Sequence, residues 1–462
     1  MCRKGDPTNG ATGASVYRVY GPLKTTLTLL SYGDLRICLI AADFATWTLG
    51  VWRELRKEVA SVLGLPFSHV VYFSSHNHST PMMEVGVTAL DAAKPKLTRR
   101  ARQLLELACK AAKSLPRRLE PVTIWWSLGH EKRISYNRKG RRADGSTFLM
   151  REEDRLLYGV DFCGDIDTHA PVVCLKGRDG RPVAFLAQFN AHPVTSYHPE
   201  HLVVHGDYPR TACDMLSGHF KDRRGLPPVS FLQGCAGDIN SKKMFVGGVR
   251  WAERYGRCLG QTYIRAAKKL RRSEREGMDY GIETARIPFA PLPSPRVLEC
   301  EIQEIRDFIA RGRAGDENTL SCVGLNFPRA LSPAYRTRLV EAILPWSQWA
   351  LNMHRRGKAG QVPRHFEMKV YVIRLGDVGI AGLPCEAFMG IGRLIRDGSP
   401  LPLTIPCGYA NETDFYVTDG PNTGDGDYMS AWYRYTLHPP LKKPAGDVLA
   451  HAALKMLNRF AR

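Results

Sequence analysis

The sequence predicts a mixed α/β fold in which β-sheets are flanked by helices. Apolar runs of strand length alternate with amphipathic stretches of helix length along most of the chain. Several predicted strands lead directly into a polar loop with His, Asp or Glu, as at the ends of strands where sites are commonly built. No internal repeat is visible in the 462 residues. A metal site at the carboxyl ends of strands fits this pattern.

The predicted elements of the first half alternate between strands and helices. Strands are expected at residues 27–31, 35–41, 70–73, 122–126, 172–175, 183–189 and 229–232. Helices are expected at residues 47–63, 96–113, 207–219 and 249–272. Asp207 and Pro209 predict an N-cap and a first-turn proline for the third helix.

The second half begins with a stretch of different character, residues 290–365, which is expected to hold two helices as an insertion or cap. Ser332 and Pro333 open the second of them. The elements expected after this stretch are strands at residues 369–375 and 378–383, a helix at 387–397 and a final helix from about residue 447. We expect residues 1–462 to form a single domain that contains the insertion.

The net charge of +20, from 65 basic and 45 acidic residues, raises the possibility of a nucleic-acid partner. The basic residues are spread along the chain, and no basic motif with interleaved aromatic residues is present. An anionic substrate explains the charge as well, so a nucleic-acid partner is disfavoured. No apolar run is long enough for a transmembrane helix, and "MCRKGDPTNG" lacks the apolar core of a signal peptide. We therefore expect a cytoplasmic protein.

Three stretches far apart in the sequence carry side chains with the chemistry of a metal site. The stretch "VVYFSSHNHSTP" ends a predicted strand on His76 and His78, "NAHPVTS" places His192 after another strand, and "PCEAF" places Glu386 after a third. Two imidazoles and a carboxylate suit Zn²⁺, with a fourth position left for tyrosine, water or substrate. Bound zinc activates water and polarises a carbonyl group.

Each of these residues also has a simpler explanation. A His-x-His pair in a loop is more often incidental than metal-binding. Glu386 could cap the helix that follows it, and Asp238 in "AGDIN" could close a turn. The metallo-β-lactamase pattern needs a further Asp and His directly after the pair, which "HNHSTP" lacks. An amidohydrolase barrel remains open, although evenly repeated strand–helix units are not evident.

The order of short motifs resembles that of the neutral (non-lysosomal) ceramidases. "SSHNHSTP" is similar to their T-H-T-H-S-G-P motif, "FNAHPVTS" to A-V-H-P-T-S, and "FLQGCAGDIN" to G-D-V-S-P-N. "GLPCEAF" is similar to L-P-G-E, "GYANETDFYVTD" to G-L-A-N-x-Y-x-x-Y, and "SYNRKG" to the N-R-S segment. These six segments occur in the family's order between about residues 20 and 440.

The resemblance implies a zinc-dependent amidase-type hydrolase with mixed sheets flanked by helices. It also assigns residues to roles. The implied metal ligands are His76, His192, Glu386 and a later tyrosine, for which Tyr428 is the nearest substitute because spacing without gaps leads to Thr423. The implied catalytic residues are His78, Arg138, Asp238, Asn240 and Tyr435. Arg138 and Tyr435 would support the developing oxyanion.

The sequence departs from this family at the residue expected to be the nucleophile. Asn240 stands where the family has a serine, and an amide side chain cannot form an acyl intermediate. Attack by metal-activated water is the alternative, with Asp238 or His78 as proton carrier.

We therefore predict a zinc-dependent hydrolase that cleaves an amide-type (N-acyl) bond in a small-molecule or lipid-like substrate, with an anionic substrate as one option. Two alternatives remain open at this point. One is a metal-dependent esterase, glycosidase or lyase on the same scaffold. The other is a non-catalytic basic protein that binds nucleic acid.

Overall fold

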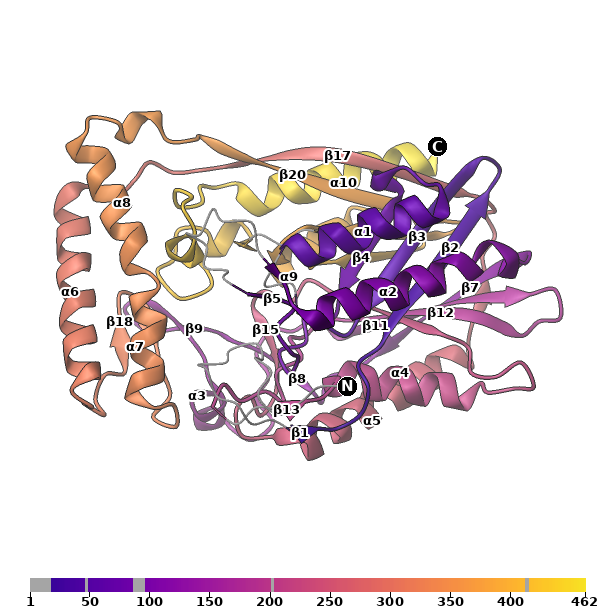
Figure 1. Ribbon diagram of the computed structural model, residues 1–462, viewed down its shortest axis with the longest axis horizontal. Coiled ribbons are helices and arrows are strands. Elements are labelled where there is room, and N and C mark those ends of the chain that lie inside the picture. Colours follow the sequence, from indigo (N-terminus) through magenta and orange to yellow (C-terminus); the bar gives the residue numbers. More distant parts are fainter. Residues whose placement is uncertain (1–17, 46–48, 86–95, 201–202, 412–414) are drawn as a thin grey trace.

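The fold was analysed in a computed structural model that describes residues 18–45, 49–85, 96–200, 203–411 and 415–462. The N-terminal stretch used above to predict localisation lies outside these residues, as do the first residues of the helix expected at 47–63. Three main sheets and the helices around them make up most of the molecule, and Figure 1 shows them to one side of a separate group of helices. The predicted mixed α/β fold is confirmed.

The three main sheets contain three, five and four strands. The first has the order β2 (Thr25–Tyr32), β3 (Leu35–Ala42), β4 (Val70–Ser74). The second has the order β14 (Val229–Gln233), β12 (Pro182–Phe189), β11 (His169–Gly177), β7 (Val122–His130), β16 (Arg271–Arg272). The third has the order β17 (Met278–Pro288), β20 (His365–Leu375), β21 (Val378–Gly382), β23 (Leu403–Cys407).

Each main sheet contains antiparallel neighbours and one parallel pair. The parallel pairs are β3 with β4, β12 with β14, and β21 with β23. Two isolated bridges, between Phe73 and Ala410 and between Gly234 and Cys407, tie the three sheets together where these strands end. The loops that follow the parallel strands therefore meet in one region.

Side chains alternate between the two faces of each strand, and in the central strands both faces are buried. On one face, residues from all three sheets share a single core that includes Leu39, Val173 and Ile373. On the other face, neighbours such as Cys174 and Val372 pack beneath helices. Because both faces are covered, these strands are almost continuously apolar, which is why the sequence shows them clearly.

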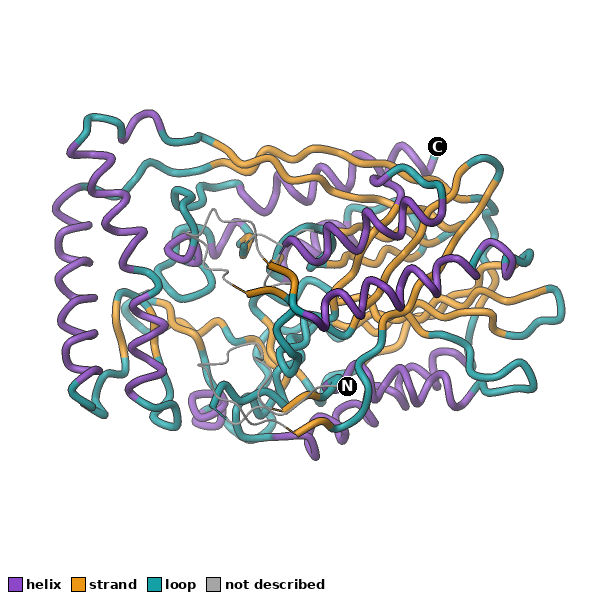
Figure 2. Tube along the Cα trace, viewed as in Figure 1, coloured by secondary structure: helices purple, strands orange, loops and turns teal. Residues whose placement is uncertain are grey.

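Three pairs of helices cover the outer faces of the sheets, as the purple tube segments of Figure 2 show. The first sheet is covered by α1 (Leu49–Leu63) and α2 (Arg99–Ser114). The second is covered by α4 (Asp207–His219) and α5 (Gly248–Ala267). The third is covered by α9 (Met389–Asp397) and α10 (Ala445–Ala461).

The stretch at residues 290–365 holds three helices rather than the expected two. They are α6 (Pro295–Arg313), α7 (Pro333–Glu341) and α8 (Leu344–Arg355), and they stand apart from the sheets in Figure 1. The side chain of Ser332 accepts a hydrogen bond from Tyr335 N at the start of α7, as predicted. Two small apolar clusters hold the helices together, and Tyr428 and Tyr435 pack against one of them. We call α6, α7 and α8 the helical segment.

Short elements complete the described structure. The two-stranded ribbons pair β1 (Arg18–Val19) with β13 (Val203–Val204), β5 (Glu84–Val85) with β6 (Lys96–Leu97), β8 (Ser135–Asn137) with β15 (Ile239–Ser241), β9 (Lys139–Arg141) with β10 (Thr147–Leu149), β18 (Ser321–Cys322) with β19 (Leu325–Asn326), and β22 (Glu386–Ala387) with β24 (Tyr416–Val417). The remaining helix is α3 (Glu152–Leu157), and short 3₁₀ turns lie at Phe67–His69, Pro116–Arg118, Ala359–Gln361, Gly420–Asn422 and Trp432–Tyr435.

Two expectations about individual elements were wrong. Asp207 does not cap α4: it is the first residue of the helix, and its carboxylate instead accepts hydrogen bonds from the backbone and hydroxyl of Ser196 at 2.7 Å. Strand β17 was missed because its partly exposed, mixed sequence lacks the apolar run of a doubly buried strand. It pairs with β20 along its whole length.

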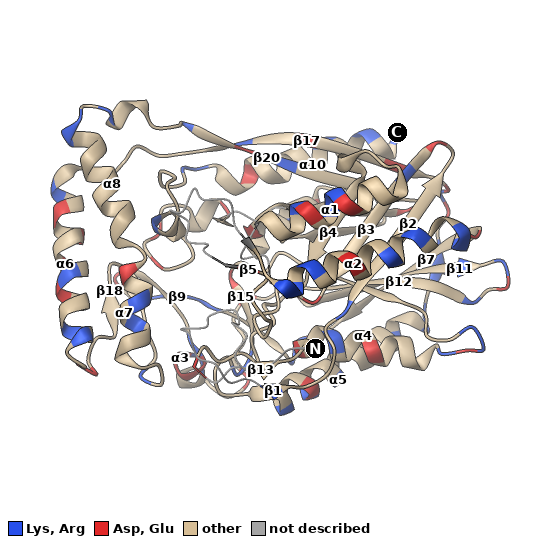
Figure 3. Ribbon diagram, in the orientation of Figure 1, with Lys and Arg blue, Asp and Glu red and all other residues tan. Residues whose placement is uncertain are grey.

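The surface carries both charges in close alternation. Figure 3 shows basic and acidic residues interspersed on α1, α2 and α6, which is typical of a solvated surface and not of a single basic face. None of the helices in the described part of the chain is long and apolar enough to cross a membrane. All eleven cysteines in the described ranges are free thiols, and most are buried.

Candidate metal centre

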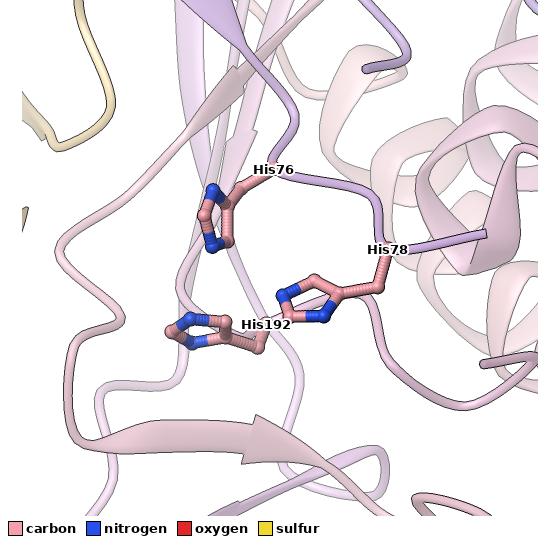
Figure 4. A group of neighbouring side chains, drawn as sticks. All are labelled: His76, His78 and His192. Atoms are coloured by element: carbon pink, nitrogen blue, oxygen red, sulfur yellow. The ribbon is translucent and has the colours of Figure 1, made fainter. Parts of the chain in front are cut away.

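Three histidines meet at the carboxyl ends of two parallel strands. His76 and His78 follow β4, and His192 follows β12. Figure 4 shows their imidazole rings turned toward one another, and one ring nitrogen from each lies within 4.8 Å of the others. His76 and His192 are almost completely buried, and His78 is half-buried. Sequence-distant strands therefore deliver three candidate metal ligands to one point.

Glu386 closes the fourth side of this cluster. It follows β21 and lies in β22, and its Oε2 is 2.8 Å from His192 Nε2 and 3.4 Å from His76 Nε2. Burial opposes ionisation of this carboxyl group, but the neighbouring imidazoles of His76 and His192 outweigh burial and hold its pKa well below the usual range. An ionised carboxylate thus stands against the imidazoles.

Backbone contacts orient two of the imidazoles. His192 Nδ1 donates to the carbonyl of Ala236 at 2.6 Å, which leaves the lone pair on Nε2 for a metal ion. His76 adopts a left-handed conformation with φ of 57°, an uncommon state for a residue with a side chain. Its backbone N–H is held by Phe44 O at 3.1 Å and Ser74 Oγ at 2.8 Å. The surrounding loops therefore determine where the His76 ring points.

The imidazoles of His192 and His78 are held in their neutral forms. Burial lowers the pKa of His192 to about 4, and Arg138 adds to this effect. Burial also holds the pKa of His78 well below its usual range, with further contributions from His76 and His192. Neutral imidazole is the form that binds metal. The donor set of three imidazole nitrogens and one carboxylate fits Zn²⁺ and related divalent ions.

Arg138 lies directly beside the cluster with its guanidinium almost fully hydrogen-bonded. Nε and Nη2 donate to Gly237 O at 3.1 and 2.6 Å, and Nη1 donates to Asn240 Oδ1 at 3.0 Å. Nη2 also donates to the hydroxyl of Tyr416 at 2.9 Å and lies 3.4 Å from His192 Nε2. A fixed positive charge therefore borders the point where the histidines meet.

Gly237 permits the close approach of the segments that carry these groups. A Cβ atom at this position would lie 2.6 Å from the carbonyl oxygen of Glu386. The Gly237 N–H donates to Ala387 O at 2.8 Å. The neighbouring residue Asp238 ties the same two segments together, because its Oδ1 accepts from Met389 N at 2.7 Å. Burial raises the pKa of Asp238 to about 6.

Two tyrosines that were not among the predicted ligands contact the cluster. Tyr416 is paired with Glu386 in the β22–β24 ribbon, and its hydroxyl accepts a hydrogen bond from Arg138 at 2.9 Å. The hydroxyl of Tyr409 lies 3.3 Å from His192 Nε2. Tyr416 belongs to the "GYANETDFYVTD" segment, so the signal was present, but spacing without gaps passes over it to Thr423.

Of the two predicted tyrosines, Tyr428 lies against Tyr416 with ring centroids 6.1 Å apart, and Tyr435 packs edge-to-face against Tyr428 at 6.0 Å. The Tyr435 hydroxyl donates to Leu339 O in α7 at 3.3 Å, away from the histidines. Asn240 contacts Arg138 and is bridged to His192 through the backbone.

Comparisons with known proteins find similarity in structure but not in sequence. No family model matches the chain, and no curated protein is similar to it in sequence. A solved structure of a ceramidase complexed with C2 matches with a TM-score of 0.66 over 98% of this chain and 73% of that one, at 14% identity. A crystal structure of neutral ceramidase from Pseudomonas aeruginosa matches with a TM-score of 0.56 over 92% and 67%, also at 14% identity. The chain therefore has the fold of the neutral ceramidases.

Proposed function

We propose that this protein is a metal-dependent hydrolase that cleaves an amide-type (N-acyl) bond. The observation that carries the proposal is the convergence of His76, His78, His192 and Glu386 beside the buried guanidinium of Arg138. The fold shared with ceramidases supports the choice of an amide bond. Fold alone does not determine substrate, so the proposal depends on the site.

The metal would be held by His76, His192 and Glu386, with His78 or Tyr416 at the remaining position. Zinc suits this combination of nitrogen and oxygen donors. When bound, such an ion lowers the pKa of water toward neutrality and polarises a carbonyl group. The hydrogen bond from His192 Nδ1 to Ala236 and the pairing of Glu386 with Tyr416 would keep two of these ligands in place.

Arg138 is placed to stabilise the negative charge that develops on the carbonyl oxygen. Its hydrogen bonds to Gly237, Asn240 and Tyr416 hold the guanidinium without reorganisation during the reaction. Asn240 would serve as an acceptor that orients Arg138, since it cannot act as an acyl-forming nucleophile. This arrangement supports direct attack by water on the amide carbon.

His78 is the better placed of the two predicted proton carriers. Its ring centroid lies 5.0 Å from that of His76, whereas both carboxylate oxygens of Asp238 face backbone and side-chain donors outside the cluster. In amide hydrolysis, the oxygen of water bonds to the carbonyl carbon, the carbon–nitrogen bond breaks, and a proton from water passes to the departing amine. Neutral His78 can accept the proton from water and return it to nitrogen.

Metal analysis combined with turnover tests the proposal. The purified protein should contain a stoichiometric divalent metal, and it should release carboxylic acid from N-acyl amides in a reaction that stops with a chelator and resumes with Zn²⁺. Matched esters and glycosides tested in parallel separate amide specificity from the alternative bond types. Absence of both bound metal and metal-stimulated amide hydrolysis would refute the proposal.

A further inference from the structure

Arg151 carries a guanidinium group with few partners inside the protein. It follows β10, and its backbone N–H donates to Asp154 Oδ2 at 2.8 Å. The side chain makes one hydrogen bond, from Nη2 to Asn326 O at 3.1 Å. Its Nε atom is buried and has no hydrogen-bond partner in the part of the chain that the structure describes. No carboxylate of the described residues lies within ion-pairing distance of it, and Glu153 acts only at longer range.

A neighbouring arginine shows what a structural role looks like in the same segment. Arg155 is almost fully buried and forms a two-point ion pair with Glu152 at 3.1 and 2.9 Å. It also donates to the carbonyl groups of Val160 and Phe162 at 2.9 and 2.8 Å. Arg155 is thus saturated by internal acceptors, whereas Arg151 keeps donors unused.

Aromatic side chains connect Arg151 to the histidine cluster. The guanidinium lies 5.8 Å from the ring centroid of Phe245, which in turn lies 5.8 Å from that of Tyr197. The Tyr197 centroid is 5.1 Å from that of His78. Tyr335 of α7 contributes to the raised pKa of Tyr197 and so brings the helical segment close to this wall. Arg151 therefore faces the same region as His78, at the other end of an aromatic wall.

The wall supplies hydrogen-bond donors but no negative charge. Burial raises the pKa values of Tyr197 and Tyr428 well above the usual range, so both phenols remain protonated. Arg138 and Arg151 both lower the pKa of Tyr428, although burial outweighs them. Burial lowers the pKa of Arg151, but an arginine stays protonated at neutral pH. Arg151 is partly buried, and a partly desolvated cation without an acidic partner is stabilised by a ligand that supplies the opposite charge.

We propose that Arg151 binds an anionic group of the substrate, of the carboxylate or phosphate type, at a distance from the scissile amide. The planar guanidinium fork matches the paired oxygens of such groups. This inference rests on the proposed function, because the amide hydrolysis defines which end of the substrate lies at the metal centre. It identifies the substrate class as an N-acyl compound with a negatively charged end.

Paired substrates that differ only in charge test this subsite. N-octanoylglycine carries a carboxylate, N-octanoylglycinamide replaces it with a neutral carboxamide, and release of octanoate reports both reactions. The kcat/KM of the charged compound should exceed that of the neutral one by roughly 10- to 100-fold, the range for a charge-assisted hydrogen bond. N-octanoylaminomethylphosphonate distinguishes a phosphate-type from a carboxylate preference, and the β-alanine and γ-aminobutyrate analogues vary the spacing.

Two substitutions at Arg151 and one control assign the preference. Arg151→Gln should bring the ratio of the two kcat/KM values close to unity, and Arg151→Lys should give an intermediate ratio because it keeps the charge without the planar fork. Arg306→Gln makes the same charge change on the exposed face of α6 and should preserve the ratio. Equal rates in the wild type, or a preference that survives Arg151→Gln, would overturn the proposal.

A binding measurement separates failure of the subsite from failure of the proposed function. If the metal-loaded protein hydrolyses neither compound, the amide-hydrolase proposal fails, and calorimetry with N-octanoylglycine still tests Arg151. Weaker binding to Arg151→Gln than to Arg306→Gln would then support the anion site, and equal binding would overturn it. If both compounds are hydrolysed at equal rates, the hydrolase proposal stands and the anion site is rejected.

Discussion

Arg138 and Arg151 differ in how many of their side-chain donors find acceptors inside the protein. Arg138, on the side built from strand ends, donates to Gly237, Asn240 and Tyr416 and has little freedom to change partners. Arg151, on the side that faces the helical segment, has one internal acceptor and a buried nitrogen without any. A saturated group is suited to holding a fixed position, and an unsaturated one is suited to receiving a ligand.

The same contrast extends to the residues around each arginine. His192 and Glu386 are positioned by short contacts with each other and with the loop that follows β14. On the other side, Tyr335 belongs to α7 and Tyr435 donates to Leu339 O of α7, so the positions of both rings depend on the helical segment. Substitutions on the strand side should therefore remove activity, while substitutions on the helical side should change which substrate is preferred.

The largest effect is expected from breaking the strand side at its centre. His192→Ala should remove bound metal and lower turnover by more than the roughly 100- to 1,000-fold that a single oxyanion donor contributes. Metal content by mass spectrometry and octanoate release measure the two losses. His451→Ala, on the exposed face of α10, is the matched control and should retain both. Full metal content in His192→Ala would contradict the assignment of His192 as a ligand.

A substitution at Asp238 tests whether ionisation of a buried carboxyl group on the strand side lowers the free energy of unfolding. Burial raises its folded-state pKa to about 6 from 3.8, so the folded protein binds the proton more tightly than the unfolded chain. Stability should therefore fall as pH rises through this window, by up to about 3 kcal/mol. Asp238→Asn removes the titration while keeping an acceptor for Met389 N.

The measurement is urea unfolding of both proteins at pH 4 and pH 7. Relative to wild type, the free energy of unfolding of Asp238→Asn should be larger at pH 7 than at pH 4, because only the wild type loses stability as the pH rises. The variant Asp154→Asn, at the first turn of α3, controls for a general change in net charge. A difference between Asp238→Asn and wild type that does not depend on pH would show that burial does not perturb Asp238.

Tyr416 sharpens the distinction between the tyrosines of the two sides. Tyr416→Phe keeps the ring but removes the hydroxyl that accepts a hydrogen bond from Arg138 beside Glu386. Loss of such a supporting contact typically costs about 10- to 100-fold in metal affinity or activity. Competition with a chromophoric chelator measures the metal affinity, and kcat is measured at saturating metal. Unchanged metal affinity and unchanged kcat would show that the Tyr416 hydroxyl has no role at the candidate metal centre.

The sequence predicts the sheets better than the surroundings of the site. Strands β4 and β12 are apolar on both faces, so a continuous apolar run in the sequence shows where each strand lies and where it ends. Strand β17 is partly exposed and was missed, because its pairing with β20 depends on contacts distant in sequence. The third helix of the helical segment was missed as well, since α7 and α8 follow one another almost without a break.

The candidate site shows the same division between local and distant information. His76, His192 and Glu386 are found from the sequence because each follows a strand that the pattern reveals. Tyr416 and Arg151 are not, because their contacts are set by the ribbon of β22 with β24 and by the position of Asn326. Such contacts arise only when segments separated by dozens of residues are brought together.

The smallest effect is expected at Tyr435, where sequence reasoning predicted an oxyanion donor. Its hydroxyl is bonded to Leu339 O in α7, so Tyr435→Phe should lower the free energy of unfolding by about 1 kcal/mol, the usual value of one hydrogen bond. Turnover should change far less than in Tyr416→Phe, because the ring still supports Tyr428. Urea unfolding and octanoate release, measured on both variants side by side, give the comparison. A loss of kcat in Tyr435→Phe that matches the loss in Tyr416→Phe would move Tyr435 into the reaction, and the helical side would then take part in chemistry as well as recognition.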